Sequence, residues 1–479
     1  MNDSKILVIG AGPSGIAAAT RLVENGFQNV VLIEAESRIG GRIHTIPFGA
    51  NVIDLGAQWC HGEKDNIVFD LANPCNLLES TGDVYEEYKV IRSNRQIVNE
   101  DTSNKLKTIV NESVVRRKED LNSYDGSLGS YLTDFFYNRL DLVENIGIDR
   151  TIAKEFLENY MKFENSVEAS DTLFEVSGKS YLEYIDCEGD ILLNWKDKGY
   201  IRFLNLLLKS NGSDYGTLKE RVLLNKTVTS INWDKTRDLQ TEVVFTDGEK
   251  ISADHVICTV SLGVLKEKHL TMFKPNLPPS QQRAIEGIAF GTVNKIFLEF
   301  PHKFWPEDWT GFTLLWREED LEEIKGTDKE WLEDVFGFYI VNYQPNILAS
   351  WIIGPHGRYM ETLEEDDILD GLMWLLRKFL SFPVPTPSNF KTTKWYTNSN
   401  FRGSYSYRSI RTEELDAWAD DLSVPLTVTS TGKPVLQFAG EATSKHFYST
   451  VHGAVEAGWR EADRLINFYN SAIDPNSQL

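Results

Sequence analysis

Cysteine is scarce in this chain, and long apolar runs are absent. The 479 residues include four cysteines, and no two of them form a Cys-x-x-Cys motif. This pattern excludes a disulfide framework and gives no sign of a metal site, so a reducing, cytoplasmic location is expected. No stretch of about 18 apolar residues occurs, which predicts that no helix spans a membrane.

Basic residues are outnumbered by acidic ones. The sequence has 49 Lys and Arg against 71 Asp and Glu, a formal net charge of −22. Such a field repels nucleic acids and anionic membrane surfaces, so neither is expected as a partner, whereas a cationic ligand would be attracted. The length exceeds what one hydrophobic core usually supports, so two domains or one large composite fold are expected.

The N-terminal segment has the pattern of a dinucleotide-binding unit. A β-branched run at residues 5–9 leads into the glycine-rich turn 10–15 (GAGPSG), an alanine-rich helical segment and a second strand that ends at Glu34. The glycines let the backbone approach a pyrophosphate at a helix N-terminus, and the acid is placed to bind ribose hydroxyls. This pattern predicts a Rossmann-type domain with a dinucleotide at Gly10, Gly12, Pro13, Ser14, Gly15 and Glu34.

The residues just beyond Glu34 favour FAD over NAD as the dinucleotide. The segment that follows Glu34 ends in Gly40, Gly41 and Arg42. Here the sequence resembles the flavin-containing amine oxidases, whose signature continues E-x-x-x-x-x-G-G-R. The resemblance recurs in family order over roughly residues 4–470, and it is closest to the spermine oxidase and N1-acetylpolyamine oxidase branch. Its further motifs lie at 54–62 (DLGAQWCHG), 192–206, 290–300 (FGTVNKIFLEF), 395–407 (WYTNSNFRGSYSY) and 434–466.

The resemblance implies an FAD that is bound noncovalently. Ser404 stands where monoamine oxidases carry the cysteine that joins FAD, and a serine cannot form that thioether. The amides at the start of the last helix would point at the flavin ring. Beyond the glycine turn, the residues implied to contact FAD are Gly41, Arg42, Gly56, Ala57, Gln58, Trp59, Val228, Trp395, Gly440, Glu441, Thr450 and Val451.

Two residues are expected to be catalytic. Lys295 stands among apolar neighbours, where a lysine is costly unless it is solvated or paired, and the resemblance implies that it binds a water bridging to the flavin N5. His61 would project toward the substrate, where it could hydrogen-bond a substrate nitrogen or set its protonation. The residues expected to contact the substrate are Trp59, His61, Tyr405, Phe447 and Tyr448.

The implied fold is α/β, with a Rossmann-type FAD-binding domain and an α+β substrate-binding domain. Both domains are expected to be discontinuous in sequence. The FAD-binding domain is expected at 1–80, 214–289 and 396–470, the substrate-binding domain at 81–213 and 290–395, and a tail at 471–479.

The implied enzyme is an FAD-dependent polyamine oxidase acting on spermine, spermidine or N1-acetylated polyamines. Hydride transfer to flavin N5 would be followed by imine hydrolysis to amine plus aldehyde and by reduction of O2 to H2O2. One alternative is a diverged FAD-binding interaction protein, because residues 408–415 (RSIRTEEL) depart from the family pattern. A histone lysine demethylase is less favoured, because the chain starts four residues before its flavin strand and has no long helical insertion.

Substrate preference, the side of the nitrogen that is oxidised and the oligomeric state stay open at this point. The location has a second possibility as well. The sequence ends in Ser477, Gln478 and Leu479, which resembles the peroxisomal SKL address with glutamine at the basic position. The peroxisome is therefore kept as an alternative to the cytoplasm.

Overall fold

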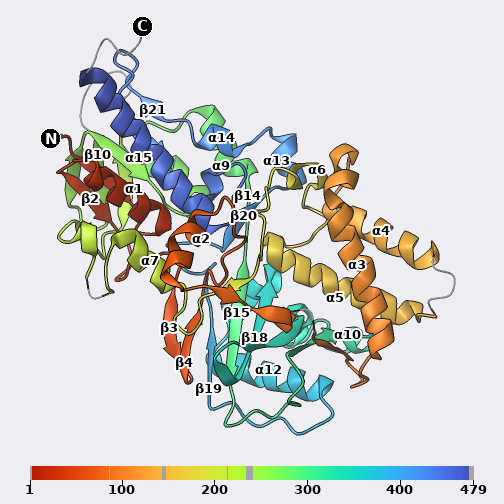
Figure 1. The fold of residues 1–479 in the computed structure, drawn as a ribbon. Coiled ribbons are helices and arrows are strands. Elements are labelled where there is room, and N and C mark those ends of the chain that lie inside the picture. Colours follow the sequence, from red (N-terminus) through yellow and green to blue (C-terminus); the bar gives the residue numbers. More distant parts are fainter. Residues whose placement is uncertain (1–2, 86, 143–146, 213, 234–240, 474–479) are drawn as a thin grey trace.

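The computed structural model describes residues 3–85, 87–142, 147–212, 214–233 and 241–473. Two six-stranded sheets organise these residues, one beside helices α1 and α15 and the other in the opposite half of the molecule (Figure 1). Helices and strands alternate along much of the chain. The arrangement confirms the predicted α/β class with a Rossmann-type half and a second half built on its own sheet.

The first sheet is built around β1 (Ile6–Ile9), whose four residues are all buried. This strand pairs in parallel with β2 (Val30–Ile33) and with β12 (His255–Cys258). Alternate side chains of β1 enter two cores, one with α1 (Pro13–Glu24) and α15 (Val451–Ile473), the other with a four-stranded sheet. A continuous apolar run suits a strand buried on both faces. Beyond β2 the sheet ends with β8 (Val222–Leu223), and beyond β12 it continues with β22 (Pro434–Phe438) and ends with the antiparallel β21 (Leu426–Thr427).

Helices α1 and α15 pack closely on this sheet. A Cβ added at Gly458 would lie 2.1 Å from the carbonyl oxygen of Ser14, so α15 meets α1 through a glycine. Residues 193–208, which the sequence assigned to the substrate-binding domain, pack in the same core, where Trp195 and α7 (Ile201–Leu208) lie near α1. The domain bounds themselves stay predictions.

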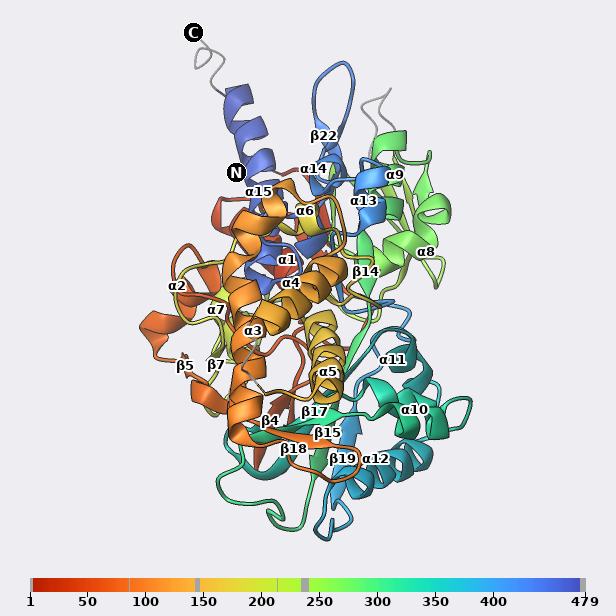
Figure 2. The same ribbon diagram turned by 90° about the vertical axis from the view of Figure 1, so that its right-hand side faces the viewer.

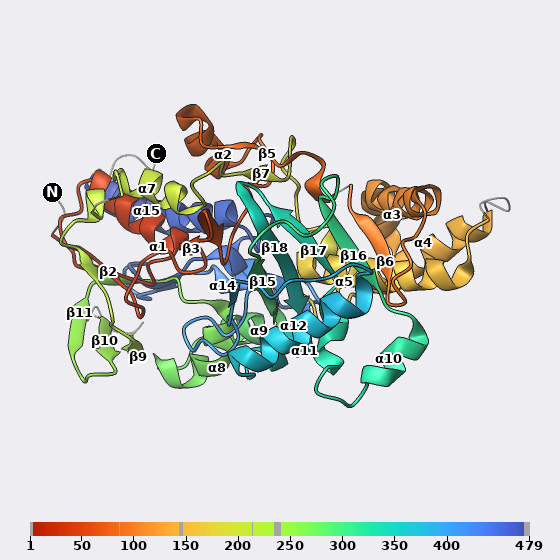
Figure 3. The same cartoon turned by 90° about the horizontal axis from the view of Figure 1, so that it is seen from below.

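The second sheet is mostly antiparallel. One face packs on α12 (Glu365–Phe379), seen beside β15 and β18 in Figure 3. Helices α3 (Glu100–Asp120), α4 (Leu128–Leu142) and α5 (Arg150–Glu168) form a separate layer, which faces the viewer in Figure 2. The strands are, in order across the sheet, β19 (Asn389–Thr392), β15 (Val293–Glu299), β18 (Gln344–Ile353), β17 (Gly337–Val341), β16 (Gly311–Leu315) and β6 (Lys89–Arg92), which runs parallel to β16.

The chain passes between the two halves through a pair of short strands. β14 (Ala289–Gly291) and β20 (Tyr405–Tyr407) pair in antiparallel fashion at the centre of Figure 1. Ser404, just before β20, donates its backbone N–H to the carbonyl of Gly291 at 2.7 Å, and its Oγ bonds to the backbone of Val293. The face of the second sheet that carries Val293 and Phe297 is thereby turned toward the first half.

The remaining elements are short. None of the helices in the described ranges is long and apolar enough to cross a membrane. The sequence Ser477, Gln478 and Leu479 lies outside the described residues. The other elements are β3 (Thr45–Phe48), β4 (Asn51–Asp54), β5 (Glu79–Ser80), β7 (Leu193–Asn194), β9 (Val228–Asn232), β10 (Thr241–Phe245), β11 (Lys250–Ala253), β13 (Phe273–Lys274), α2 (Ile67–Ala72), α6 (Gly178–Tyr181), α8 (Leu262–Met272), α9 (Pro279–Gly287), α10 (Glu318–Ile324), α11 (Gly354–Met360), α13 (Ile410–Glu414) and α14 (Ala419–Leu422).

Candidate active site

A cavity of about 1040 Å³ extends from the end of β1 to helices α3 and α5. Both halves of the molecule line it, because the glycine turn and α15 contribute from the first half and strands β15, β17 and β18 from the second. Most of the residues predicted to form the site from sequence line this single cavity.

The glycine turn forms one end of the cavity. Gly10, Gly12, Pro13 and Ser14 line it, and Gly15 does not. A Cβ at Gly15 would lie 1.9 Å from the carbonyl oxygen of Gly10, so this glycine lets α1 start directly against β1. The Ser14 Oγ is buried and has no hydrogen-bond partner among the described residues, although it borders the cavity. A buried hydroxyl of this kind is suited to a bound polar ligand.

Glu34 fixes the turn from the end of β2. Its carboxylate accepts hydrogen bonds from the backbone N–H groups of Ala11 and Glu36, both at 2.8 Å. Burial raises the pKa of Glu34, whereas these two backbone donors lower it. Each carboxylate oxygen keeps a second lone pair, so Glu34 can also accept from a ribose hydroxyl.

Arg42 brings a cation to the same cavity. Its Nη1 donates to the carbonyl of Ser404 at 2.6 Å and to Oε1 of Glu441 at 2.9 Å. Glu441 in turn accepts from the Ser406 hydroxyl at 2.6 Å and from the Ser449 N–H at 2.8 Å. In the part of the chain that the structure describes, Nε and Nη2 of Arg42 have no hydrogen-bond partner, which leaves two donor nitrogens for an anion such as a pyrophosphate.

A helix N-terminus and two tryptophan-bearing segments complete this region. Thr450 accepts a hydrogen bond from the Gly453 N–H at 3.1 Å and so caps α15, and Thr450 and Val451 both border the cavity. A Cβ at Gly56 would lie 1.8 Å from the Arg42 carbonyl oxygen, so the loop lies flat against its neighbour. Trp395 packs edge-on against Phe401, with ring centroids 5.1 Å apart. Four features of this region fit a flavin dinucleotide. They are the glycine turn, the Ser14 hydroxyl that lacks a partner among the described residues, the free donor nitrogens of Arg42 and the N-terminus of α15.

Lys295 lies in β15 opposite Trp351 of β18. Its Nζ donates to the carbonyls of Asp54 at 2.9 Å and Gly56 at 2.8 Å and to Oε1 of Gln58 at 2.7 Å. These three acceptors match the three donors of an ammonium group. Burial lowers the pKa of Lys295, whereas the carboxylate of Asp54 raises it. Lys295 thus ties a cofactor-side loop to the second sheet, and the predicted bridging water stays a prediction.

His61 lies on the cavity wall with one ring nitrogen fixed. Its Nδ1 is 2.8 Å from the carbonyl oxygen of Ile191. Because a carbonyl only accepts, Nδ1 carries the proton, and the neutral ring then has an unprotonated Nε2. Burial lowers the pKa of His61, which favours this neutral form. His61 therefore offers an acceptor to a ligand N–H.

An aromatic wall continues from Trp59. The Trp59 ring stacks near Trp351, with centroids 6.0 Å apart, and meets Tyr85 edge-on at 5.3 Å. Tyr85 contacts Tyr339 at 5.3 Å, and Tyr339 contacts Tyr88 at 6.0 Å. All five rings line the cavity. Only Trp59 was predicted from sequence, because the other four come from segments that the second sheet brings together.

Glu168, at the C-terminal end of α5, was also missed. It is buried and lines the cavity, and among the described residues it has neither a hydrogen-bond partner nor a basic partner within ion-pair distance. Burial and the like charge of Glu164 raise the pKa of Glu168 to about 8. The signal in the sequence was the spacing: Glu164 and Glu168 continue the buried face of α5 that includes Phe156 and Leu157.

The predicted substrate residues do not all reach the cavity. Trp59, His61, Tyr405 and Tyr448 line it. Phe447 is not among the lining residues, and its ring packs on His452 with centroids 4.9 Å apart. Of these two neighbours in the turn before α15, only Tyr448 lines the cavity.

The fold and the cavity define a two-domain flavin-dependent oxidoreductase. The chain belongs to the family of flavin containing amine oxidoreductases, whose model matches residues 13–466. It is therefore an FAD-dependent amine oxidase.

Several of the relatives are named as oxidases of polyamines. The peroxisomal N(1)-acetyl-spermine/spermidine oxidase of Homo sapiens is 30% identical, with 97% of this chain and 95% of that protein aligned. Polyamine oxidase 1 of Oryza sativa subsp. japonica is 28% identical, with 98% of each chain aligned. A solved structure of putrescine oxidase bound to putrescine superposes with a TM-score of 0.69 at 18% identity, covering 97% of this chain and 99% of that one, and shows the shared fold.

Proposed function

We propose that this amine oxidase acts on polyamines, namely spermine, spermidine or their N1-acetylated forms. The observation that carries the proposal is Glu168, a buried carboxylate without a basic partner in the described part of an aromatic-walled cavity. A carboxyl at such depth stays protonated unless a ligand cation comes to it and stabilises the ionised form. The names of the relatives support the same substrate class.

FAD would be held without a covalent bond. The residues around the glycine turn would hold its adenosine part, Arg42 its pyrophosphate, and Trp395 with Thr450 and Val451 its ring system. Ser404 offers no thiol, and its hydroxyl bonds to the backbone of Val293 at 2.9 Å. Bound FAD would accept the hydride, which is one proton with two electrons, from the carbon beside the amine nitrogen, and O2 is the final electron acceptor.

Different residues of the cavity would bind the charged and the uncharged nitrogens of the substrate. A polyamine carries several ammonium groups at neutral pH, yet the nitrogen beside the reacting carbon needs a free lone pair. Glu168 would bind a distal ammonium group. His61 Nε2 would accept a hydrogen bond from the N–H of the reacting nitrogen, which turns its lone pair away from the histidine.

The wall residues would exclude bulk water. Trp59, Tyr85, Tyr339 and Trp351 present ring faces and edges to the methylene segments of a polyamine. Apolar surface of this kind binds alkyl chains between charged ends. Lys295 would keep the loop with Gly56 in place against the second sheet, which preserves the width of the cavity near the cofactor.

Anaerobic mixing of the flavin-loaded protein with a substrate panel tests the proposal. Spermine, spermidine or N1-acetylspermine should bleach the visible flavin band, and butylamine, which has no distal cation, should do so far more slowly. Glu168→Gln should lower the ratio of the bleaching rate with a polyamine to the rate with butylamine at least tenfold, because only the polyamine reaction becomes slower. Air should then restore the band and release peroxide. A flavin that stays oxidised with every polyamine contradicts the proposal.

A further inference from the structure

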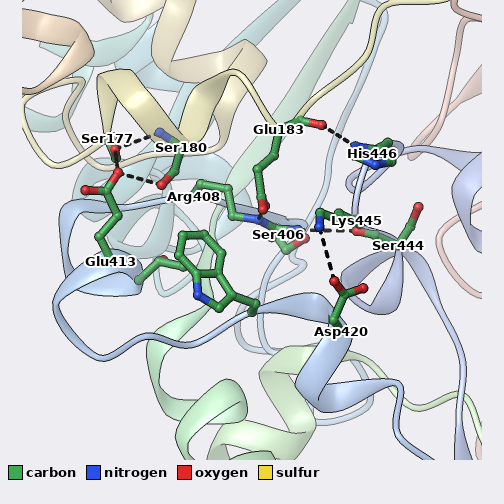
Figure 4. A network of polar contacts seen from close by, with 12 residues as sticks. Ser177, Ser180, Glu183, Ser406, Arg408, Glu413, Asp420, Ser444, Lys445 and His446 are labelled. Carbon is green, nitrogen blue, oxygen red and sulfur yellow. Dashed lines mark hydrogen bonds and ion pairs between the residues drawn. The ribbon is translucent and has the colours of Figure 1, made fainter. Parts of the chain in front are cut away.

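The segment that departs from the family pattern after Tyr407 places a buried arginine behind the cavity wall. Arg408 is 0% exposed. Its Nε donates to Oε2 of Glu183 at 2.9 Å, and its Nη2 donates to the carbonyl of Ser444 at 3.3 Å (Figure 4). Helix α13 begins two residues later, and its Glu413 accepts a hydrogen bond from the Ser180 hydroxyl at 2.6 Å.

One nitrogen of this guanidinium has no hydrogen-bond partner among the residues that the structure describes. Nη1 of Arg408 is buried and unpaired in the described part of the chain, whereas Cζ lies 4.1 Å from the ring centroid of Tyr448. A cation over an aromatic face is attracted by the negative face of the ring, so the ring takes the place of the missing acceptor. Tyr448 lines the cavity and Arg408 does not, so the tyrosine lies between the guanidinium and the cavity.

Tyr448 is held firmly in this position. The next residue, Ser449, has a φ of 67°, a value that needs support in a residue with a side chain. The support comes from Glu441, which accepts the Ser449 N–H at 2.8 Å. Glu183, the ion-pair partner of Arg408, is held through its backbone, because its carbonyl oxygen lies 2.9 Å from Nδ1 of His446.

We infer that Arg408 is a positioning residue that makes the Tyr448 ring bind a neutral amine well and an ammonium group poorly. A ring that already binds one cation attracts a second one less, because the two charges repel each other across it. Glu168 lines the same cavity, and no basic side chain of the described residues lies within ion-pair distance of it. The inference rests on the proposed function and adds its specificity: the distal nitrogen binds charged at Glu168 and the nitrogen beside Tyr448 binds uncharged.

Binding of a matched pair of ligands tests the inference apart from turnover. Choline is a permanent cation, and 3,3-dimethylbutan-1-ol has nearly its shape without the charge. Their Kd values are measured from the change in the visible spectrum of flavin-loaded protein that carries Glu168→Gln throughout, so that choline cannot bind at the Glu168 carboxylate. In Arg408→Met combined with Glu183→Gln, which removes the buried pair together, choline should bind at least tenfold more tightly. The alcohol should change less than twofold.

Arg408→Lys is the matched control, because it keeps a cation behind the ring and should retain the wild-type ratio of the two Kd values. Two outcomes overturn the inference. One is a ratio of the two Kd values in the double variant that equals the ratio with Arg408 and Glu183 intact. The other is a ratio in Arg408→Lys that equals that of the double variant. The kinetic counterpart is a lower KM with a lower kcat below neutral pH in the double variant, since protonated substrate then binds unproductively.

Tyr448→Leu keeps the test decisive if the double variant does not load flavin. Because the wild-type ring binds a cation poorly, this change should weaken the binding of choline and of the alcohol alike. A loss of affinity for choline alone overturns the inference. These arms need no substrate oxidation. A protein that shows the binding pattern but bleaches with no polyamine contradicts the proposed function and leaves the role of Arg408 standing.

Discussion

Binding of a cation in the cavity should expel a proton from Glu168. Burial and the charge of Glu164 raise the pKa of Glu168 to about 8, so about nine-tenths of this carboxyl is protonated at pH 7. An ammonium beside it favours the ionised form. If pairing restores the ordinary value of 4.5, about 0.9 proton leaves for each cation bound at pH 7.

Titration calorimetry in two buffers of different ionisation enthalpy counts this proton. Hexamethonium is a suitable ligand, because a bis-quaternary alkane has neither a proton to lose nor a lone pair to be oxidised. At pH 9 the release should fall to about 0.1, since Glu168 is then already ionised. Glu168→Gln should abolish the release and weaken binding about tenfold or more, because a hydrogen bond or contact to a charged group is worth about 1.5–3 kcal/mol.

Two results would refute this reasoning. If Glu168→Gln releases the same number of protons as the wild type, the proton comes from another group, such as His61. If the wild type releases none at pH 7, Glu168 is already ionised and its burial does not govern its charge. Equal flavin absorbance per protein in both forms is the control that the cavity is intact.

Lys295→Met should leave FAD bound yet slow peroxide release at least tenfold, because three contacts to the loop of Asp54 are lost, and an unchanged rate would contradict its assigned role. Arg42→Met should raise the Kd for FAD, followed by flavin fluorescence on dilution, at least tenfold, since it removes the open donors; unaltered retention would count against a pyrophosphate contact. Glu168→Gln should raise Tm more at pH 8 than at about pH 5, because a carboxyl with a raised pKa loses its contribution to stability as pH rises from 4.5 toward about 8; equal shifts would oppose this. For spermine, kcat/KM should fall with added salt more steeply than for N1-acetylspermine, and equal slopes would reduce the net charge of −22 to a matter of solubility.

The dinucleotide end of the site was predictable because its determinants are local. Strand β1, the turn 10–15 and α1 are contiguous in the chain, and Gly15 is required by a contact with Gly10, five residues away. The acid at the end of β2 completes a unit that folds from one continuous stretch. Sequence pattern alone carries such information, and the predicted residues of this stretch line the cavity, with Gly15 the exception.

The substrate end was not predictable in the same way. Tyr85, Tyr339, Trp351 and Glu168 come from four separate segments, and the packing of the second sheet against α5 brings them to one cavity. Each looks like core or surface when read in its own segment, and Glu168 in particular ends an ordinary amphipathic helix. The choice between Phe447 and the next residue depends on a one-residue change of direction, which composition and spacing do not encode.

Acidity acts at two distances in this protein. Exposed charges are screened within about 8 Å at physiological salt, so the excess of acidic residues governs the arrival of a cation rather than its final position. Within the cavity most acids are already neutralised: Glu164 pairs with Arg117 at 3.2 Å, Asp186 with Lys118 at 3.1 Å and Glu441 with Arg42 at 2.9 Å.

Glu168 differs from these acids because no basic side chain of the described residues lies within ion-pair distance. Added salt should therefore lower the rate of capture without changing the number of protons that leave Glu168. The two measurements separate the long-range field of the chain from the single carboxylate that selects the ligand.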